Sequence, residues 1–271
     1  MTQSYRPGFR AALDDLASGL HLWRSWWLLS WQQVRSQYRR TVLGPWWISI
    51  QRAIFFAGLS LLFGVLMKQD MRTFVPFVAV GFMMFQFMVT SINSGTTAIT
   101  GNAAQFKGSS MPLSVLAFRT VAVNLIQLGH DAVVLVIVLV GFRVHVNWTL
   151  LLAPLAIALL VLNALAFALW LGPSNARYRD LSPLITSVTG ILFFFTPIFW
   201  RTQDISARQR SVLTGWNPLT YLLETVRGPL IGMPFDGVMW AGALAVTVAN
   251  VAVAFWVFSK TRLELAYWVQ S

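Results

Sequence analysis

Polar side chains interrupt a long apolar run, residues 115–142, at helical spacing. They recur at intervals of four, three and four residues, and a histidine stands beside the last of them: Thr120, Asn124, Gln127, His130 and Asp131. This spacing places the four non-histidine positions on one face of a helix. An ionised aspartate near the middle of a membrane costs about 2.5–3.5 kcal/mol, so such a residue faces protein or water. The stripe predicts either a polar path or lock at a moving helix interface, or an ordinary hydrogen bond between helices.

A basic segment leads into the first long apolar run. The stretch "RSQYRRTVLGPWWISIQR", residues 35–52, carries Arg35, Arg39 and Arg40 ahead of a Gly-Pro and a Trp-Trp pair. Arginine and tryptophan gather at membrane surfaces, so these residues predict where the chain enters the membrane from the cytoplasm. Arg52 lies deeper. We expect its head to snorkel back to the surface, the alternative being that it faces an aqueous path.

Signals of enzymatic chemistry are weak. Nine Asp and Glu residues are spread along the chain, and only Asp14 and Asp15 are adjacent. The histidines, His21, His130 and His145, lack metal-ligand spacing, and there is no cysteine. No GxxxxGKS or GxxxxGKT phosphate loop occurs. We therefore expect no catalytic residue, metal or cofactor in this chain, and any ATP that drives it must be bound, with its Mg²⁺, by a separate chain.

The composition predicts an integral membrane protein. The chain is 56% hydrophobic and 11% charged, whereas about 25% of the residues in soluble domains are charged. An apolar run of about 18 residues or more can cross a bilayer as a helix. We expect an all-α fold with six spans, at 43–67, 74–98, 115–142, 149–172, 183–200 and 237–258. They form one domain, 1–271, with a cytoplasmic helix (1–40), a membrane region (43–258) and a cytoplasmic tail (259–271).

Basic residues set the expected orientation. With the N-terminus inside, twelve Lys and Arg residues fall on the cytoplasmic face and seven on the other, while Arg52 falls inside the first span. The excess predicts that both termini are cytoplasmic. The net charge of +11 is interpreted as attraction to anionic membrane lipids, because no motif supports nucleic-acid binding.

The N-terminal region is typical of an amphipathic helix. Apolar residues recur there every three or four positions: Phe9, Leu13, Leu16, Leu20, Trp23, Trp27, Trp31, Val34 and Tyr38. Asp14, Asp15 and Arg24 fall mostly between them. We expect this helix to lie in the membrane interface with its tryptophans at headgroup depth. The alternative is a helix that packs on another protein domain.

Aromatic residues are abundant, with 13 Trp and 20 Phe. They crowd the second span and the end of the fifth, around Pro197: Phe82, Phe85, Phe87, Phe193, Phe194, Phe199 and Trp200. Most rings in membrane helices face lipid or fill packing gaps. The alternative is an aromatic-lined conduit, which would suit a sugar chain because sugar C–H faces stack on rings without binding tightly at one place.

Four segments resemble the membrane subunit of ABC exporters for O-antigen, capsule and related polysaccharides. This is the Wzm/KpsM group of the broader ABC-2 permease superfamily. The segments, in chain order, are "YRRTVLGPWW" (38–47), "SMPLSVLAFR" (110–119), "ARYRD" (176–180) and "NPLTYLLETVR" (217–227). The resemblance covers nearly the whole chain, and the six spans counted above agree with it independently. Relatives often have proline at the position of Arg52. This chain departs from the family there, and the departure bears on the shape of its first membrane helix.

The resemblance implies an assembly. Two copies of the chain form a channel, and two cytoplasmic ATPase subunits drive it. Residues 102–112 would form a cytoplasmic gate: Asn102, Gln105, Phe106, Lys107, Met111 and Pro112. Residues 203–235 would form re-entrant helices at the outer end, with a helix boundary at Asn217-Pro218. We expect the N-terminal segment and the 99–114 connection to dock into the ATPase, whereas the arginines of "ARYRD" are explained by topology.

The implied substrate is a polysaccharide built on polyprenyl pyrophosphate in the cytoplasm and exported across the bacterial inner membrane. Arg35, Arg39 and Arg40 would then lie near the mouth of the conduit. Guanidinium groups make charge-assisted hydrogen bonds with phosphates, so these arginines either hold the pyrophosphate or serve membrane topology. Two other functions remain: an ABC-2 permease for a small molecule or lipid, and a membrane enzyme that acts on a polyprenyl-linked sugar.

Overall fold

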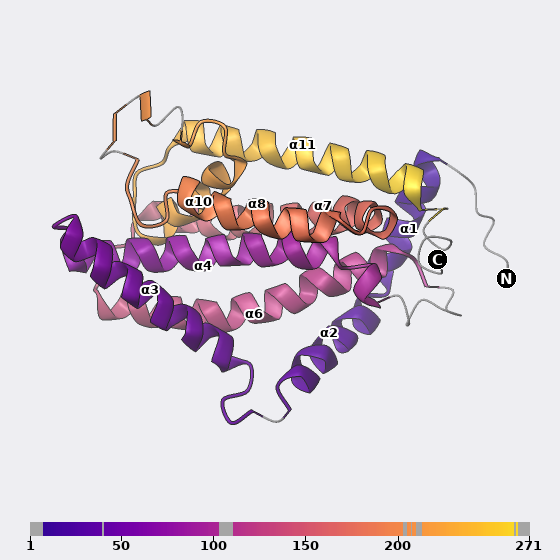
Figure 1. The fold of residues 1–271 in the computed structure, drawn as a ribbon, viewed down its shortest axis with the longest axis horizontal. Helices are drawn as coiled ribbons and strands as arrows, with labels where there is room; N and C mark the ends of the chain where they lie inside the picture. The colour runs from indigo at the N-terminus through magenta and orange to yellow at the C-terminus, as the bar shows by residue number, and fades with distance from the viewer. Residues whose placement is uncertain are drawn as a thin grey trace.

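Helices make up most of the described chain, and no strand occurs within it. The computed structural model describes residues 8–39, 41–102, 111–202, 205–206, 208–209, 213–262 and 264. Within these ranges, five helical segments are long and apolar enough to cross a membrane: α3 (Trp46–Leu66), α4 (Met71–Thr96), α6 (Ser114–Gly141), α7 (Ala153–Arg177) with the preceding 3-10 helix η2 (Trp148–Leu152), and α11 (Gly237–Thr261). They form an elongated bundle (Figure 1). The all-α membrane fold expected from the sequence is confirmed.

The span expected at 183–200 forms a shorter helix than the others. This helix, α8 (Leu181–Phe195), has 15 residues and so rises about 22 Å, less than the ~30 Å hydrocarbon core of a bilayer. It ends because Thr196 is extended (φ −93°, ψ 135°), the conformation that a following proline favours. Pro197 therefore stops the helix inside the expected span.

Helix α4 occupies the centre of the bundle. In its most apolar window 78% of the residues are buried, against 22% for α3, α6 and α11, and α4 packs on α3, α6, α7 and α8. A close crossing brings α4 against α7. A Cβ atom on Gly95 would lie 3.0 Å from the backbone nitrogen of Ala168, and one on Gly172 would lie 3.2 Å from the carbonyl oxygen of Gly95. Small residues allow this approach, as is common between membrane helices.

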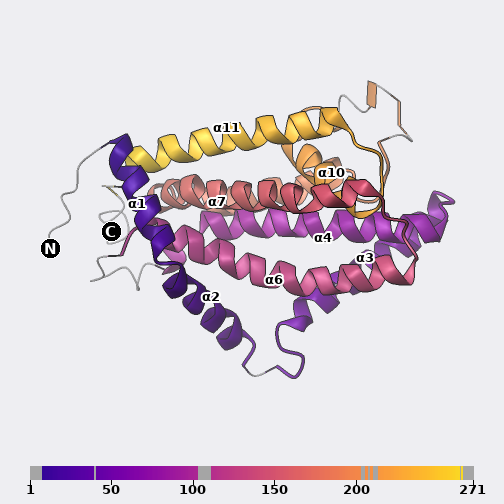
Figure 2. The same cartoon turned by 180° about the vertical axis from the view of Figure 1, so that it is seen from behind.

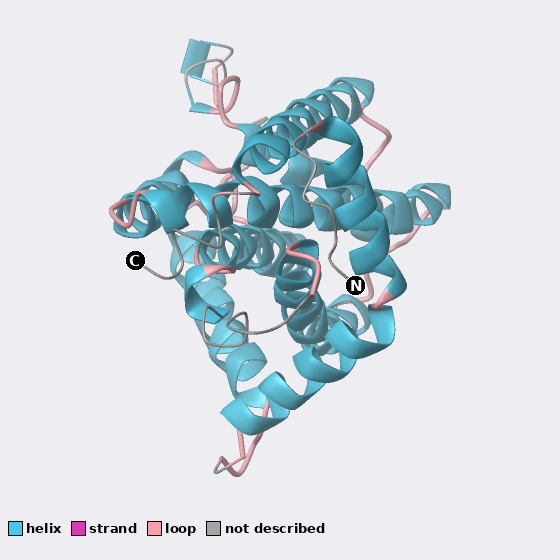
Figure 3. Cartoon of the chain, turned by 90° about the vertical axis from the view of Figure 1, so that its right-hand side faces the viewer, coloured by secondary structure: helices cyan, strands magenta, loops and turns pink. Residues whose placement is uncertain are grey.

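The predicted N-terminal helix is two helices, α1 (Phe9–His21) and α2 (Trp23–Gln37), separated at Leu22. They lie across one end of the bundle, which we call the terminal end because α11 also finishes there (Figures 1 and 2). Figure 3 looks onto this end. One face of the pair packs on α6, while apolar side chains on the other face stay exposed: Leu13, Leu20, Trp23, Trp27 and Trp31. An interfacial position of this exposed face stays a prediction, as does its packing on another protein domain.

The opposite end of the bundle, the far end, holds the starts of α4 and α11, the end of α6 and the short helix α10 (Pro218–Leu230). Helix α10 begins at the expected boundary: the Asn217 side chain accepts a hydrogen bond from the backbone N–H of Leu219 at 3.0 Å. Eight of the 13 residues of α10 are buried. The resemblance implied short re-entrant helices over 203–235, and α10 is a short helix within that range.

Candidate functional site

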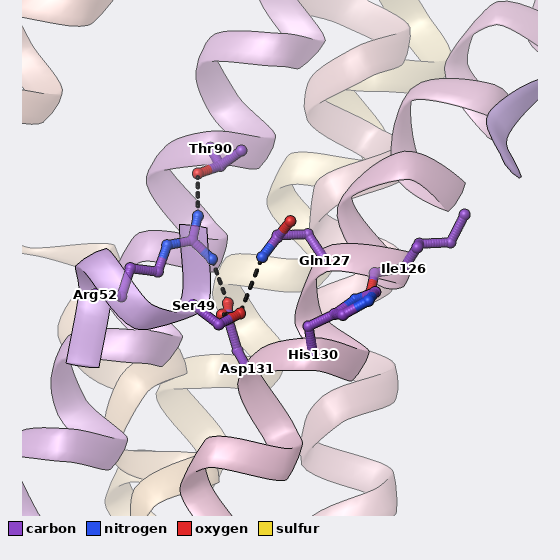
Figure 4. A network of polar contacts seen from close by, with 7 residues as sticks. All are labelled: Ser49, Arg52, Thr90, Ile126, Gln127, His130 and Asp131. Carbon is purple, nitrogen blue, oxygen red and sulfur yellow. Dashed lines mark hydrogen bonds and ion pairs between the residues drawn. The ribbon is translucent and has the colours of Figure 1, made fainter. Parts of the chain in front are cut away.

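An ion pair between two membrane helices lies at the centre of the candidate site. Arg52 of α3 contacts Asp131 of α6 through Nη1 and Oδ2. The Asp131 side chain is fully buried, and the Arg52 side chain is 12% exposed. Ser49 Oγ donates to Asp131 Oδ1 at 2.6 Å, and Arg52 Nη2 donates to Thr90 Oγ1 of α4 at 3.4 Å (Figure 4). The network therefore joins α3, α4 and α6.

Helical spacing explains why these side chains meet. Ser49 and Arg52 are three residues apart on α3, and Gln127 and Asp131 are four apart on α6, so each pair shares a helix face. Gln127 Nε2 also donates to Ser49 Oγ at 3.1 Å. The two charges cancel, and hydrogen bonds satisfy the carboxylate, which offsets much of the cost of burying either charge alone. The arrangement can hold three helices in one register.

The expected snorkelling of Arg52 is wrong. Its head turns toward α6 and pairs with Asp131, because an opposite charge at the same depth is a better partner than a distant headgroup. The available signal was the presence of one base and one acid in different apolar spans. Spacing within either span gave no indication that the two would face each other.

Three members of the predicted polar stripe lie outside this network: Thr120, Asn124 and His130. Thr120 Oγ1 donates to the carbonyl oxygen of Leu116 on its own helix at 2.9 Å. Asn124 Nδ2 donates to Ser94 Oγ of α4 at 2.8 Å, so it makes the ordinary interhelical hydrogen bond that the sequence allowed. His130 hydrogen-bonds through Nδ1 with the carbonyl oxygen of Ile126, one turn earlier on the same helix, at 2.8 Å. The residues of the stripe therefore share one helix face, but they bind several separate partners in the structure.

A cavity of about 820 Å³, which we call the basic groove, opens where α2 ends and α3 begins. It is lined by Trp31, Gln32, Val34, Arg35, Ser36, Tyr38, Arg39, Pro45 and His130. Arg35 lies in the last turn of α2 and Arg39 two residues past its end, and both reach the same cavity. Burial raises the pKa of the Tyr38 phenol, and nearby Arg52 partly opposes this. Tyr38 is thus a neutral donor at physiological pH. Arg40 lies outside the described residues.

Most of the rings expected to line a path are packed between helices. Phe82, Phe85, Phe87 and Phe199 are all buried. Phe82 stacks on Phe55 of α3 with ring centroids 4.9 Å apart, and Phe199 stacks on Phe63 at 4.3 Å. For these four the path interpretation is corrected to helix packing. The remaining three keep exposed surface, most of all Phe194, which is 67% exposed; the others are Phe193 and Trp200.

The expected cytoplasmic gate is described at its two edges. Asn102 ends the 3-10 helix η1 (Thr100–Asn102), and its Nδ2 donates to the carbonyl oxygen of Ala98 at 2.8 Å. Met111 is exposed, and Pro112 is buried just before α6 begins. The three residues between them that the sequence analysis assigned to the gate lie outside the described residues: Gln105, Phe106 and Lys107.

Asp15 of α1 caps the start of α6, a contact that the sequence analysis missed. Its carboxylate accepts the backbone N–H groups of Leu113 at 3.3 Å and of Ser114 at 3.0 Å, which satisfies helix-terminal donors. Ser114 Oγ donates back to the Asp15 carbonyl at 2.8 Å. One turn later Gly19 permits the approach, because a Cβ there would collide with Ser114 Oγ. The partners are about 99 residues apart, so no local motif reveals them.

A second buried ion pair lies at the far end, and the sequence analysis missed this one too. Arg227 of α10 is fully buried. It pairs with Glu224 through Nη2 and Oε1, and its Nη1 donates to the carbonyl oxygen of Pro197 at 2.6 Å. Its guanidinium carbon also lies 3.7 Å from the centroid of the Phe77 ring. Arg227 thus joins α10 to α4 and to the segment that follows α8.

Comparison with known proteins relates this arrangement to transport. The family described as ABC-2 type transporter matches residues 24–231, a range that contains both ion pairs, the basic groove and α10. The chain is also 25% identical over 240 residues to a protein of Myxococcus xanthus described as "O-antigen export system permease protein RfbA". That similarity covers 87% of this chain and 91% of the Myxococcus protein.

Proposed function

The chain belongs to the ABC-2 type transporter family, and we propose that it is the permease subunit of a polysaccharide exporter. It would form the channel through which a polyprenyl-linked polymer of the O-antigen or capsule type leaves the cytoplasm across the bacterial inner membrane. The observation that carries the proposal is the near full-length similarity to a protein described as an O-antigen export permease. The terminal end of the bundle would then be cytoplasmic and the far end external.

We propose that two copies enclose the conduit. Helix α8 supports this, because it packs on α4 and α7 and leaves a row of apolar side chains exposed on its other face: Leu184, Val188, Ile191 and Phe194. A second copy opposite this face would bury part of the row and leave Phe194, with Phe193 and Trp200, as candidates to line the path. The number of copies is part of the proposal.

ATP hydrolysis would come from two copies of a cytoplasmic ATPase. The sequence has no phosphate loop of its own, so a separate ATPase chain must bind to it and supply the energy. We propose that it docks at the terminal end, against α1, α2 and the start of α6. Asp15 ties α1 to the first turn of α6, so a push on α1 would reach α6 and, through Asp131, the α3–α6 ion pair.

Deletion of this chain in its host is expected to abolish surface polysaccharide and leave lipid-linked polymer in the cytoplasm. Complementation should restore export only in the presence of an active partner ATPase, and affinity purification should recover two copies of each chain. Immunoblots of outer-membrane and cytoplasmic fractions, with mass determination of the purified complex, would measure this. A purified single chain that hydrolyses ATP by itself would contradict the proposal.

The basic groove is our candidate for the pyrophosphate of the lipid carrier. Arg35 and Arg39 line the same cavity, close to the expected membrane surface. Two guanidinium forks can bind phosphate oxygens with paired hydrogen bonds, a geometry that lysine cannot reproduce. Since Tyr38 also lines the groove as a neutral donor, the cavity offers both charge and hydrogen bonds to an anionic headgroup.

Arg39→Lys is expected to reduce export about tenfold, the effect of losing about 1.4 kcal/mol of binding, while subunit abundance and membrane orientation stay normal. Lysine keeps the charge and therefore the topology. Arg24→Lys is the matched control, because Arg24 is an exposed arginine of α2 that does not line the groove. Export can be followed as surface polymer per subunit. Full export by the double Arg35→Lys/Arg39→Lys variant would leave these residues only a topological role.

A further inference from the structure

A large cavity at the far end is lined by arginines that no part of the proposed function uses. Its volume is about 1090 Å³, and it lies between the start of α4, the end of α6 and the segments on either side of α10. Arg72, Arg143 and Arg201 come to it from three different parts of the chain. We call it the outer cavity. Its volume is slightly above the usual range for binding sites of small ligands, which ends at about 1,000 Å³.

The acids around the outer cavity are already engaged. Asp70 caps α4 by accepting the backbone N–H of Arg72 at 3.1 Å, and Glu224 is held by the fully buried Arg227. Within the described part of the chain, neither Arg72 nor Arg143 forms an ion pair. Three arginines and one acid without a counterion among the described residues, Asp70, therefore line the cavity, which leaves an excess of positive charge there.

Arg201 also offers an unused hydrogen-bond donor. Its Nη2 donates to Thr73 Oγ1 at 3.2 Å, and its guanidinium carbon lies 5.3 Å from the centroid of the Phe77 ring. These contacts hold the head in place at the wall of the cavity. Its Nε, by contrast, is out of contact with solvent and has no hydrogen-bond partner among the described residues. A buried donor without a partner is costly, and rotation of the Arg201 head toward an anion in the cavity would give Nε an acceptor.

The backbone places Arg143 at a position that usually favours glycine. It lies just past α6 with φ +52°, and the N–H of Val144 donates to the carbonyl of Leu139 at 3.0 Å, the hydrogen bond of a glycine-type helix end. Lys68 ends α3 in the same way, with φ +51°, but does not line the cavity. A cation at either helix end interacts favourably with the helix dipole. What distinguishes Arg143 is its place among the other arginines.

We propose that the outer cavity binds the phosphate headgroup of a lipid. Arginine forks match phosphate oxygens, and the cavity lies at the end of the membrane helices, where headgroups gather. Apolar walls at Pro76, Phe77 and Phe142 suit the first carbons of the attached chain. The source is either a membrane phospholipid or the prenyl pyrophosphate carrier. Only the second source, and the assignment of this end to the outside, rest on the proposed function.

Lipid binding by the purified full-length chain tests the proposal. Native mass spectrometry in detergent would titrate phosphatidylglycerol and farnesyl pyrophosphate in separate arms, with diacylglycerol as the lipid without phosphate. Arg143→Gly is expected to weaken binding of the phosphate lipid about tenfold, while the melting temperature stays equal or rises, because glycine suits the positive φ. Lys68→Gly makes the same backbone change on α3 and is expected to leave binding unchanged.

A second variant protects the test against a folding defect. Arg72 is exposed in the first turn of α4, where a cation is unfavourable to the helix dipole, so Arg72→Gln should fold and should also weaken binding. If the wild-type chain binds phosphatidylglycerol more tightly than farnesyl pyrophosphate, the ligand is a membrane lipid. The reverse order would identify the carrier. Wild-type affinity for both in Arg143→Gly and in Arg72→Gln would overturn the site. Export is not measured, so failure of the exporter proposal would leave this result intact.

Discussion

Asp131→Asn is expected to lower the free energy of unfolding by about 3–5 kcal/mol, the usual cost of removing one partner from a buried ion pair. The variant leaves the Arg52 guanidinium, which is only 12% exposed, without its counterion inside the membrane. Ser49 Oγ would also lose a charged acceptor at 2.6 Å. Unfolding of the purified chain in detergent, followed by the fluorescence of its 13 tryptophans, would measure the change.

A double-mutant cycle separates the pair from its surroundings. Arg52→Gln/Asp131→Asn removes both charges, so it should be less destabilised than the sum of the single variants, with a coupling free energy of about 0.5–3 kcal/mol. His130→Gln is the matched control on α6, because His130 bonds to its own helix and touches α3 only through the Trp46 ring, without contact to Arg52 among the described interactions. Additive single effects would show that Arg52 and Asp131 do not stabilise each other.

The membrane helices could be predicted from sequence because their signal is local. A long apolar run identifies a span wherever it occurs in the chain, and the expected 43–67 and 237–258 appear as Trp46–Leu66 and Gly237–Thr261. The start of α10 was equally local, since Asn217-Pro218 combines a side-chain cap with a residue favoured in the first turn. In each case a few neighbouring residues contain all the information that the element needs.

The contacts of the site could not be predicted in the same way, because each depends on how distant helices meet. Arg52 and Asp131 are separated by 79 residues, and Asp15 and Ser114 by 99. The burial of single rings could not be predicted either. Phe82 and Phe194 both lie in aromatic-rich apolar runs, yet Phe82 is 2% exposed and Phe194 is 67% exposed. The difference arises because α4 is central to the bundle whereas α8 has one open face.

The ion pair at the far end depends on close packing as well as charge. Arg227 and Glu224 lie three residues apart on α10, while the rest of the Arg227 head meets α4. A Cβ atom on Gly81 of α4 would lie 3.0 Å from Arg227 Nη1 and 3.2 Å from the carbonyl oxygen of Ile198. The absence of a side chain at Gly81 therefore makes room for the guanidinium and for the backbone after α8. The pair can therefore be tested either by removing a charge or by adding a side chain at Gly81.

Arg227→Met is expected to lower the free energy of unfolding by about 3–5 kcal/mol, because Glu224 loses its counterion and the Pro197 carbonyl loses its donor. Restoring neutrality in Arg227→Met/Glu224→Gln should recover part of the loss.

Gly81→Ala provides an independent test without a change of charge. It should destabilise the protein by about 1–3 kcal/mol, because both the guanidinium and the backbone at Ile198 must shift. Gly129→Ala is its matched control, since a Cβ there meets nothing within 4 Å and alanine favours the helix by about 1 kcal/mol. Thermal unfolding of the four variants in one detergent would compare them. If Arg227→Met and Gly81→Ala both unfold like the wild type, Arg227 does not hold α10 to α4.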